Sequence, residues 1–352
     1  MKKTLCLLMA LIMLLGLLTA CGAPAPAQEE PSPLPVTEPD PTPAPEDPAP
    51  ATEVPSAELQ TPDYDPADLH PMLWKVTDAE GHTLYLFGTI HVGDGRTAAV
   101  LEKVAPILLQ CDALAVEFDM VAYEQDLGAV MADYQQFVYT DGSTVQDHMS
   151  EELYARCAEL LGQVGAYSPL IDHYNLAMWS QLVQQAALMT TTPLDPQLGM
   201  DRQLIGLAYE KELPVLEVES ASFQMNLLNS FSDELNLLQL QATLDSLDSY
   251  GADIDSLFET WLTGDYDAIL ALLNAEDEEE TEGYTDEQLA LVEDYNKALL
   301  DDRNLGMAEV ALGYLASGDT VFVAVGTAHM VDTVGLVQLL TDAGCTVERV
   351  EY

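Results

Sequence analysis

The sequence predicts an α/β fold in which two strand–Gly-Thr-x-His–helix–strand units form a central mixed sheet, with a large helical insertion between them. One apolar run ends in Gly-Thr-Ile-His at residues 88–91, and a second ends in Gly-Thr-Ala-His at residues 326–329. Between them, over about 121–275, apolar residues recur mostly at helical spacing. We expect the rest of the chain to bring the two motifs together.

Residues 1–20 predict a signal peptide. Two lysines precede an apolar run over residues 5–18 that is too short for a typical membrane span. The segment ends in Leu-Thr-Ala-Cys, which resembles the lipobox of bacterial lipoproteins, where the cysteine is lipidated. We therefore expect lipidation at Cys21 and an extracytoplasmic protein anchored to the cell membrane. The alternative is an ordinary secretory signal followed by a chance cysteine.

Residues 21–66 predict a disordered tether that follows the lipidated cysteine. Proline, alanine and acidic residues dominate this segment, which cannot bury enough apolar surface to fold. Its prolines favour extended polyproline II structure. We expect a spacer without chemistry, followed by one folded domain over residues 67–352.

The composition excludes one class of partner. The chain has 352 residues, with 60 Asp and Glu against 11 Lys and Arg, so its formal net charge is −49. Such a surface repels phosphates and argues against nucleic acid binding. The acidic run 276–282 reads as a solvated loop rather than a low-affinity calcium patch. Cys111, Cys157 and Cys345 lack metal-site spacing, so we expect free thiols, although a disulfide between two of them stays open.

The folded domain opens with a predicted β-hairpin formed by strands at 73–76 and 83–87. A helix over 98–110, interrupted by Pro106, leads to a strand over 113–119. The remaining expected elements are helices over 147–164, 172–189, 201–211, 221–249 and 253–274, a strand over 215–219, a long capped helix over 285–317 closed by Gly318, a strand over 320–325, a helix over 331–343 and a strand over 345–350.

The functional prediction starts from the motif histidines. His91 and His329 each follow a strand end, where ligands bind in parallel sheets. Glu117 ends the strand after the first motif, and we expect that strand to lie beside His91. Two imidazoles and a carboxylate suit a divalent metal with an open position, which activates water or polarises a carbonyl. Alternatively, Glu117 is a general base, and Asp119 is a less favoured member of the site.

Other signals are weaker. Residues 93–98 fit the Gly-x-Gly-x-x-Ala dinucleotide fingerprint after a strand, but Asp94 would face the pyrophosphate and an exported protein meets little dinucleotide. The remaining histidines have no motif context: His70, His82, His148 and His173.

From about Leu73 to Val350 the chain resembles the TraB/GumN family, which includes the Tiki metalloproteases. The resemblance rests on Leu-Trp-Lys-Val at 73–76, Gly-Thr-Ile-His at 88–91, Val-Glu at 116–117, Gly-Met-Asp at 199–201, Val-Glu-Ser at 218–220, Leu-Thr-Gly-Asp at 262–265, Arg-Asn at 303–304 and Val-Ala-Val-Gly-Thr-Ala-His at 323–329. Val-Glu-Ser departs mildly from the family's Leu-Glu-Thr.

This resemblance implies a fold related to erythromycin esterase and the haem-binding ChaN proteins. It implies a site built from His91, Glu117 and His329 and, for Tiki-like members, a peptidase activity that uses manganese or cobalt. Arg303 either binds a substrate carboxylate or oxyanion or anchors the long helix.

Two functions follow as expectations. The first is a surface-anchored, metal-dependent peptidase that acts on peptides or exported proteins, with a divalent ion (Mn, Co or Zn) held by His91, Glu117 and His329. The second is a non-catalytic lipoprotein that binds or sequesters a peptide or a small ligand such as haem.

Overall fold

The computed structural model describes residues 64–274 and 283–352. The predicted signal peptide, Cys21, nearly all of the tether and the acidic run 276–282 lie outside the described residues. Within them, the strands are β1 (Leu73–Thr77), β2 (Thr83–Thr89), β3 (Ala113–Val116), β4 (Val215–Glu217), β5 (Val321–Gly326) and β6 (Thr346–Arg349).

These strands form one mixed sheet in the order β4-β3-β5-β2-β1-β6. The predicted hairpin is confirmed, because β1 pairs antiparallel with β2. The two motif strands β2 and β5 are parallel neighbours, and Thr89 lies opposite Gly326. The α/β class with a mixed sheet is therefore confirmed, and both motifs begin at the same edge of the sheet.

The position of the third predicted strand differs from the expectation. β3 pairs with β5 rather than with β2, and β4 lies beyond it. Glu117, which follows β3, therefore lies next to the second motif strand and not beside the strand that leads to His91. Strand order depends on long-range packing, so the local sequence does not encode it.

The helices are α2 (Gly95–Leu108), α3 (Met120–Gln125), α4 (Leu127–Gln135), α5 (Glu151–Gln163), α6 (Leu176–Thr191), α7 (Met200–Glu210), α8 (Ala221–Asn229), α9 (Asp233–Asp245), α10 (Leu247–Thr263), α11 (Tyr266–Asn274), α12 (Asp286–Asn296), α13 (Asp302–Ser317) and α14 (Leu336–Asp342). Most of them lie between β3 and β5, so the predicted helical insertion is present.

Two predicted helices are broken. The helix expected over 221–249 divides into α8 and α9, because the Ser232 hydroxyl accepts a hydrogen bond from the Leu235 amide and starts a new helix. The helix expected over 253–274 ends at Gly264, which has a left-handed φ of 62°. A Cβ at Gly264 would lie 2.0 Å from the His70 carbonyl oxygen, so only glycine fits there.

The long helix begins and ends as predicted, but it is not continuous. Thr285 and Gln288 form the expected capping box, and Gly318 closes the helix with a φ of 83°. Between α12 and α13, Lys297–Asp301 form a π-helical turn. Such turns insert an extra residue and recur at functional sites. Arg303 follows it by two residues.

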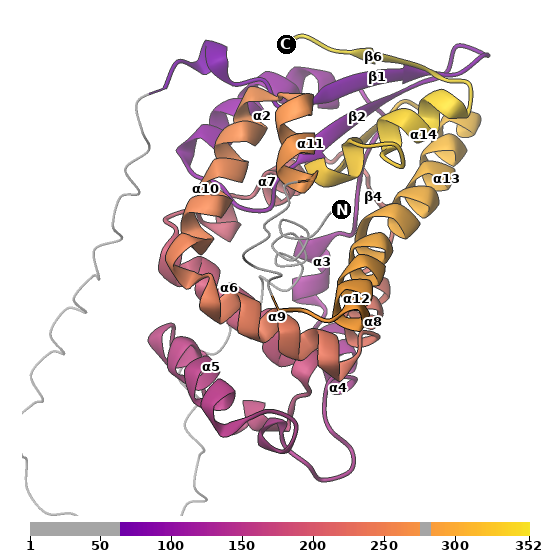
Figure 1. The fold of residues 1–352 in the computed structure, drawn as a ribbon. Helices are drawn as coiled ribbons and strands as arrows, with labels where there is room; N and C mark the ends of the chain where they lie inside the picture. Colours follow the sequence, from indigo (N-terminus) through magenta and orange to yellow (C-terminus); the bar gives the residue numbers. More distant parts are fainter. Residues whose placement is uncertain (1–63, 275–282) are drawn as a thin grey trace, which may run out of the picture.

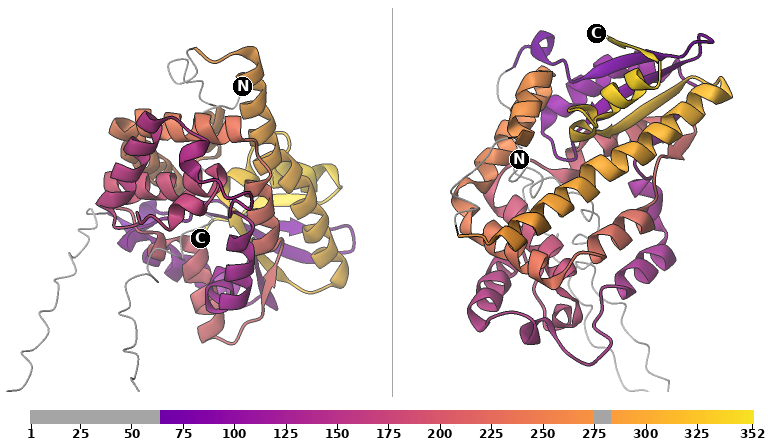
Figure 2. Two further views of the ribbon diagram at one scale, coloured as in Figure 1. Left: turned by 90° about the horizontal axis from the view of Figure 1, so that it is seen from below. Right: turned by 45° about the vertical axis from the view of Figure 1, so that its right-hand side comes forward.

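The core surrounds the middle of the sheet. β3 is buried along its length, and β5 up to its last residue, which is typical of parallel strands covered on both faces. Helix α13 packs against β2 and β5, and α7 packs against β3 and β4. The sheet and α14 lie at one end of the domain, whereas α4 and α5 lie at the other (Figure 1). Figure 2 shows the length of α12 and α13 from a second side.

Two further features complete the fold. Cys111, Cys157 and Cys345 are buried free thiols, as expected. In the described part of the chain, no helix has the length and apolar character needed to cross a membrane.

Candidate functional site

The predicted site residues meet around Gly326, the last residue of β5. An ideal Cβ built on Gly326 would lie 3.2 Å from Glu117 Oε1, 3.6 Å from His91 Nε2 and 3.6 Å from His329 Cδ2. All three side chains therefore surround a point that glycine leaves free. The parallel pairing of β2 with β5 and of β5 with β3 brings them together.

His91 is held by residues of two elements. Its Nδ1 lies 2.8 Å from Asp201 Oδ2 in α7, and the Thr89 hydroxyl donates to Asp201 Oδ1 at 2.5 Å. Gly199 allows this approach, because a Cβ there would lie 2.4 Å from the His91 carbonyl oxygen. The Met200 amide then donates to the Ile90 carbonyl at 2.7 Å. As a result, Nε2 of His91 is the nitrogen that faces Gly326.

The charge of His91 depends on its neighbours. Burial alone lowers the pKa of this imidazole, but the carboxylates of Asp201 and Glu117 outweigh burial and raise the pKa to about 9. His91 is therefore a cation at neutral pH when no metal is bound.

His329, in contrast to His91, favours the neutral form of its imidazole. Its Nδ1 donates to Asn304 Oδ1 at 2.6 Å, and the residue is buried in a 3-10 turn over Thr327–Met330. Burial and the nearby Arg303 guanidinium lower the pKa of His329 to about 3. His329 is therefore neutral at neutral pH. Because Nδ1 carries the proton, Nε2 has a free lone pair, and it lies 3.8 Å from Glu117 Oε1.

Glu117 is buried and hydrogen-bonded through both oxygens. Oε1 accepts from the Gly326 amide at 2.8 Å, and Oε2 accepts from Arg303 Nη2 at 2.6 Å and from Gln224 Nε2 at 3.0 Å. Burial acts to raise the pKa of Glu117, but the Arg303 guanidinium holds it well below its usual range. The carboxylate is therefore ionised at neutral pH.

Arg303 lies between two carboxylates. Nη2 contacts Glu117, Nε and Nη2 contact Glu219 at 2.8–3.1 Å, and Nη1 donates to the Leu299 carbonyl in the π-helical turn at 3.3 Å. All three of its nitrogens thus hydrogen-bond within the protein, and the residue is 4% exposed. Of the two roles considered for Arg303, these contacts favour anchoring of the long helix over binding of a substrate.

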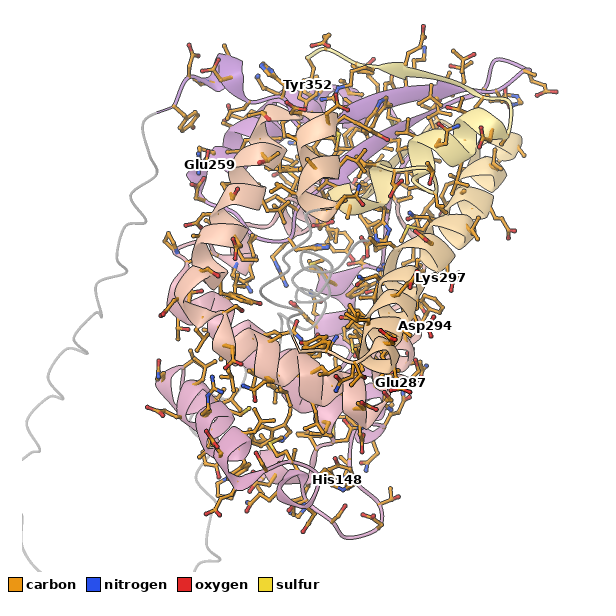
Figure 3. The ribbon with its side chains drawn as sticks, viewed as in Figure 1. His148, Glu259, Glu287, Asp294, Lys297 and Tyr352 are labelled. Carbon is orange, nitrogen blue, oxygen red and sulfur yellow. The ribbon has the colours of Figure 1, made fainter. Side chains whose placement is uncertain are left out.

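Other candidates lie outside this arrangement. Asp119 caps α3 by accepting from the Ala122 amide, so it has a structural partner. His148 stacks on Tyr139 with ring centroids 4.2 Å apart. His148 and Tyr352 lie at opposite ends of the domain (Figure 3), and the Tyr352 hydroxyl donates to the Pro71 carbonyl, two residues before β1.

The dinucleotide fingerprint is explained by packing. A Cβ at Gly93 would lie 2.5 Å from the Leu198 carbonyl oxygen, so this glycine permits a close chain crossing. The Asp94 carboxylate accepts from the Arg96 amide at the start of α2 and pairs with the Arg96 side chain. The helix start is therefore occupied by a carboxylate of the protein itself.

Two imidazoles and a carboxylate are ligand types that divalent metals bind. Both motif histidines have Nδ1 beside a side-chain oxygen, which is how metal-binding histidines are usually oriented. Nε2 of His91 lies towards Gly326, and Nε2 of His329 lies 3.8 Å from Glu117 Oε1. Among the described residues, however, no group of three or more His, Cys, Asp or Glu side chains is placed to hold a metal ion.

Four contacting residues were not assigned roles from the sequence: Asp201, Asn304, Glu219 and Gln224. Glu219 had a sequence signal, because a Val-Glu pair occurs both at the end of β3 and directly after β4. In the structure the Glu219 amide donates to the Glu117 carbonyl. Asp201 and Asn304 stand in the motifs quoted above, but only the fold shows which histidine each contacts. Gln224 lies within α8 and has no local signal.

Replacement of Arg303 by methionine tests the buried ion pairs. Arg303→Met leaves two buried carboxylates without their cation, so we expect a loss of about 3–5 kcal/mol in unfolding free energy. Lys297→Met is the control, because the Lys297 side chain is exposed and pairs with the exposed Asp302 (Lys297 is labelled in Figure 3). Its loss should be at most about 1 kcal/mol. Equal losses in urea denaturation would contradict the assignment of Arg303.

The low pKa of His329 predicts an acid-dependent loss of stability. In the unfolded chain His329 becomes protonated below its ordinary pKa of 6.5, whereas in the folded protein it stays neutral down to about pH 3. The unfolded state therefore binds more protons in this range, and the free energy of unfolding falls as the pH falls. With EDTA present, wild type should lose about 2 kcal/mol more than His329→Gln between pH 7 and pH 5. Parallel stability curves for the two proteins would show that His329 is not buried in the neutral form.

The chain is similar to known proteins. The chain is 25% identical over 179 residues to the uncharacterized protein YbaP of Escherichia coli (strain K12) and to that of Shigella flexneri, covering 51% of this chain and 63% of each relative. It thus spans less than two thirds of the length of these relatives. No solved structure matches the chain. The profile of the TraB/PrgY/gumN family matches residues 72–349, which contain both motif histidines and Glu117. The chain belongs to the TraB/PrgY/gumN family.

Proposed function

We propose that the protein is a lipid-anchored, extracytoplasmic hydrolase that cleaves peptides or exported proteins with the help of a divalent metal. His91, His329 and Glu117 would hold the metal. The observation that carries this proposal is the convergence of Nε2 of His91, the His329 ring and Glu117 Oε1 on the free space above Gly326. Family membership over residues 72–349 supports the use of these residues.

A divalent cation bound there would lower the pKa of a water molecule and polarise the carbonyl of the peptide bond. The protein's own groups have distinct tasks. His329 supplies a neutral imidazole with a free lone pair, and Asn304 keeps it in that tautomer. Arg303 keeps Glu117 ionised, so the carboxylate serves as a ligand or as a general base.

The anchoring part of the proposal rests on the sequence. Cys21 would carry the lipid and the proline-rich tether would hold the domain away from the membrane. Manganese, cobalt and zinc all remain candidates for the metal, since imidazole and carboxylate ligands suit each of them.

A second candidate is a non-catalytic lipoprotein that binds a peptide or a small ligand such as haem. The contacts of Glu117 favour it, because both carboxylate oxygens already accept hydrogen bonds from protein groups. Incubation of the protein with a peptide library and each metal, read by mass spectrometry, separates the two candidates. Cleavage supports the hydrolase, and retention of uncleaved peptides with every metal supports the binding protein.

Gly326→Ala tests the site with little cost to the fold. The backbone of Gly326 has a φ of −49°, which alanine adopts freely, and the nearest atom to the new methyl group is Glu117 Oε1 at 3.2 Å. We expect a folded protein whose affinity for manganese, cobalt and zinc falls at least tenfold in calorimetry, because the methyl group fills the space between the ligands.

Two further variants serve as controls for this measurement of metal affinity. The double variant His91→Ala/His329→Ala should lose metal binding, whereas Gly313→Ala, at an open position in α13, should bind as wild type does. If wild type and the double variant bind the metals equally, the assignment of the site is wrong.

A further inference from the structure

Four glutamine side chains form an unusual feature of the interior. Gln181 and Gln184 lie in α6, Gln224 in α8 and Gln239 in α9, and none is more than 4% exposed. Each has one buried polar atom without a hydrogen-bond partner in the described part of the chain: Gln181 Oε1, Gln184 Oε1, Gln224 Oε1 and Gln239 Nε2. Buried polar atoms are rarely left unpaired, because each costs free energy.

The Ser180 hydroxyl hydrogen-bonds to two of these amides. Gln184 Nε2 donates to Ser180 Oγ at 2.9 Å, and Ser180 Oγ donates to Gln239 Oε1 at 3.1 Å. This leaves the acceptor Oε1 of Gln184 and the donor Nε2 of Gln239 free, both in residues bonded to the same hydroxyl. Both amides are thus fixed at one end by Ser180, whereas the other end has no partner among the described residues.

Gln224 connects the amides to the proposed catalytic site. Its Nε2 donates to Glu117 Oε2 at 3.0 Å and to Glu219 Oε2 at 2.9 Å, and its Oε1 has no partner among the described residues. The next residue, Met225, packs with Ala177 and Met178 at the start of α6. Gln181 follows these two residues by about one helical turn.

The chemistry of the free atoms selects a class of ligand. They comprise three acceptors and one donor without formal charge, which suits a neutral ligand that both donates and accepts hydrogen bonds. A peptide main chain offers both N–H and C=O groups, and side-chain amides complement such groups regardless of the peptide's sequence. Gln224 lies beside Glu117, which fits the position of a peptide under cleavage.

We propose that these glutamines bind the main-chain amide groups of an extended peptide substrate and hold it next to Glu117. This inference rests on the proposed function, and it names the residues that bind the main chain of the peptide. In this arrangement, Gln224 Oε1 accepts from a peptide N–H near the bond to be cleaved, while Gln184 and Gln239 together bind a more distant peptide group.

The test compares matched methionine variants of the full chain. The proteins are immobilised in EDTA, which prevents metal-dependent cleavage, and are incubated with a tryptic digest of casein. Retained peptides are measured by mass spectrometry. Gln184→Met and Gln239→Met should each retain about tenfold less peptide than wild type, because main-chain groups of the peptide lose their partner.

Stability separates this role from a structural one. Methionine removes a buried unpaired atom at similar side-chain length, but it also removes one hydrogen bond to Ser180 Oγ. Because these two effects oppose each other, the melting temperatures of both variants should stay close to that of wild type. Gln185→Met is the control: Gln185 is a buried glutamine of α6 without a fully buried unpaired atom among the described residues. It should retain peptides as wild type does.

Retained peptides are then resynthesised with a single N-methyl group at each peptide bond in turn. Methylation at one or more bonds should weaken retention about tenfold, since it removes a main-chain donor. The proposal is overturned if wild type retains no peptide, if the methionine variants bind as wild type does, or if no N-methylation matters. Peptide retention without metal binding would instead refute the metal-dependent hydrolase and leave the glutamine assignment standing.

Discussion

The parallel pairing of β2 with β5 is the constraint on which the site depends. Its register sets Thr89 opposite Gly326, so the two Gly-Thr-x-His motifs leave the sheet at one edge and in one direction. Other contacts reinforce this edge. The Trp261 indole of α10 donates to the Gly88 carbonyl at 2.8 Å, and the Gly326 amide donates to Glu117. A shift of one residue in this register would move one motif along the strand direction relative to the other by about 3.3 Å.

Two similar motifs acquire different electrostatics from their surroundings. His91 faces the carboxylate of Asp201 and is held as a cation, whereas His329 faces the neutral amide of Asn304, lies near Arg303 and stays neutral. Arg303 itself pairs with the carboxylates of both Glu117 and Glu219 and holds the pKa of Glu117 well below its usual range. A cation, a neutral imidazole and a carboxylate therefore meet at one glycine.

The repeated motif was enough to predict that His91 and His329 approach each other, and the strand end at Glu117 was enough to add a carboxylate. The placement of β3 beside β5 was not predictable, because strand order arises from long-range packing. The helix breaks at Ser232 and Gly264 were readable as capping signals, but the apolar spacing continues through them. Gln224 reaches Glu117 from the middle of a helix, and no local pattern marks such a contact.

The central claim is that His91, His329 and Glu117 form a single metal site above Gly326. Anomalous X-ray diffraction from crystals grown with manganese, recorded at the manganese absorption edge, tests it most directly. The account predicts one strong anomalous peak at coordination distance, about 2 Å, from Nε2 of both His91 and His329. A peak elsewhere on the acidic surface, with none between these two nitrogens at full manganese occupancy, would contradict it.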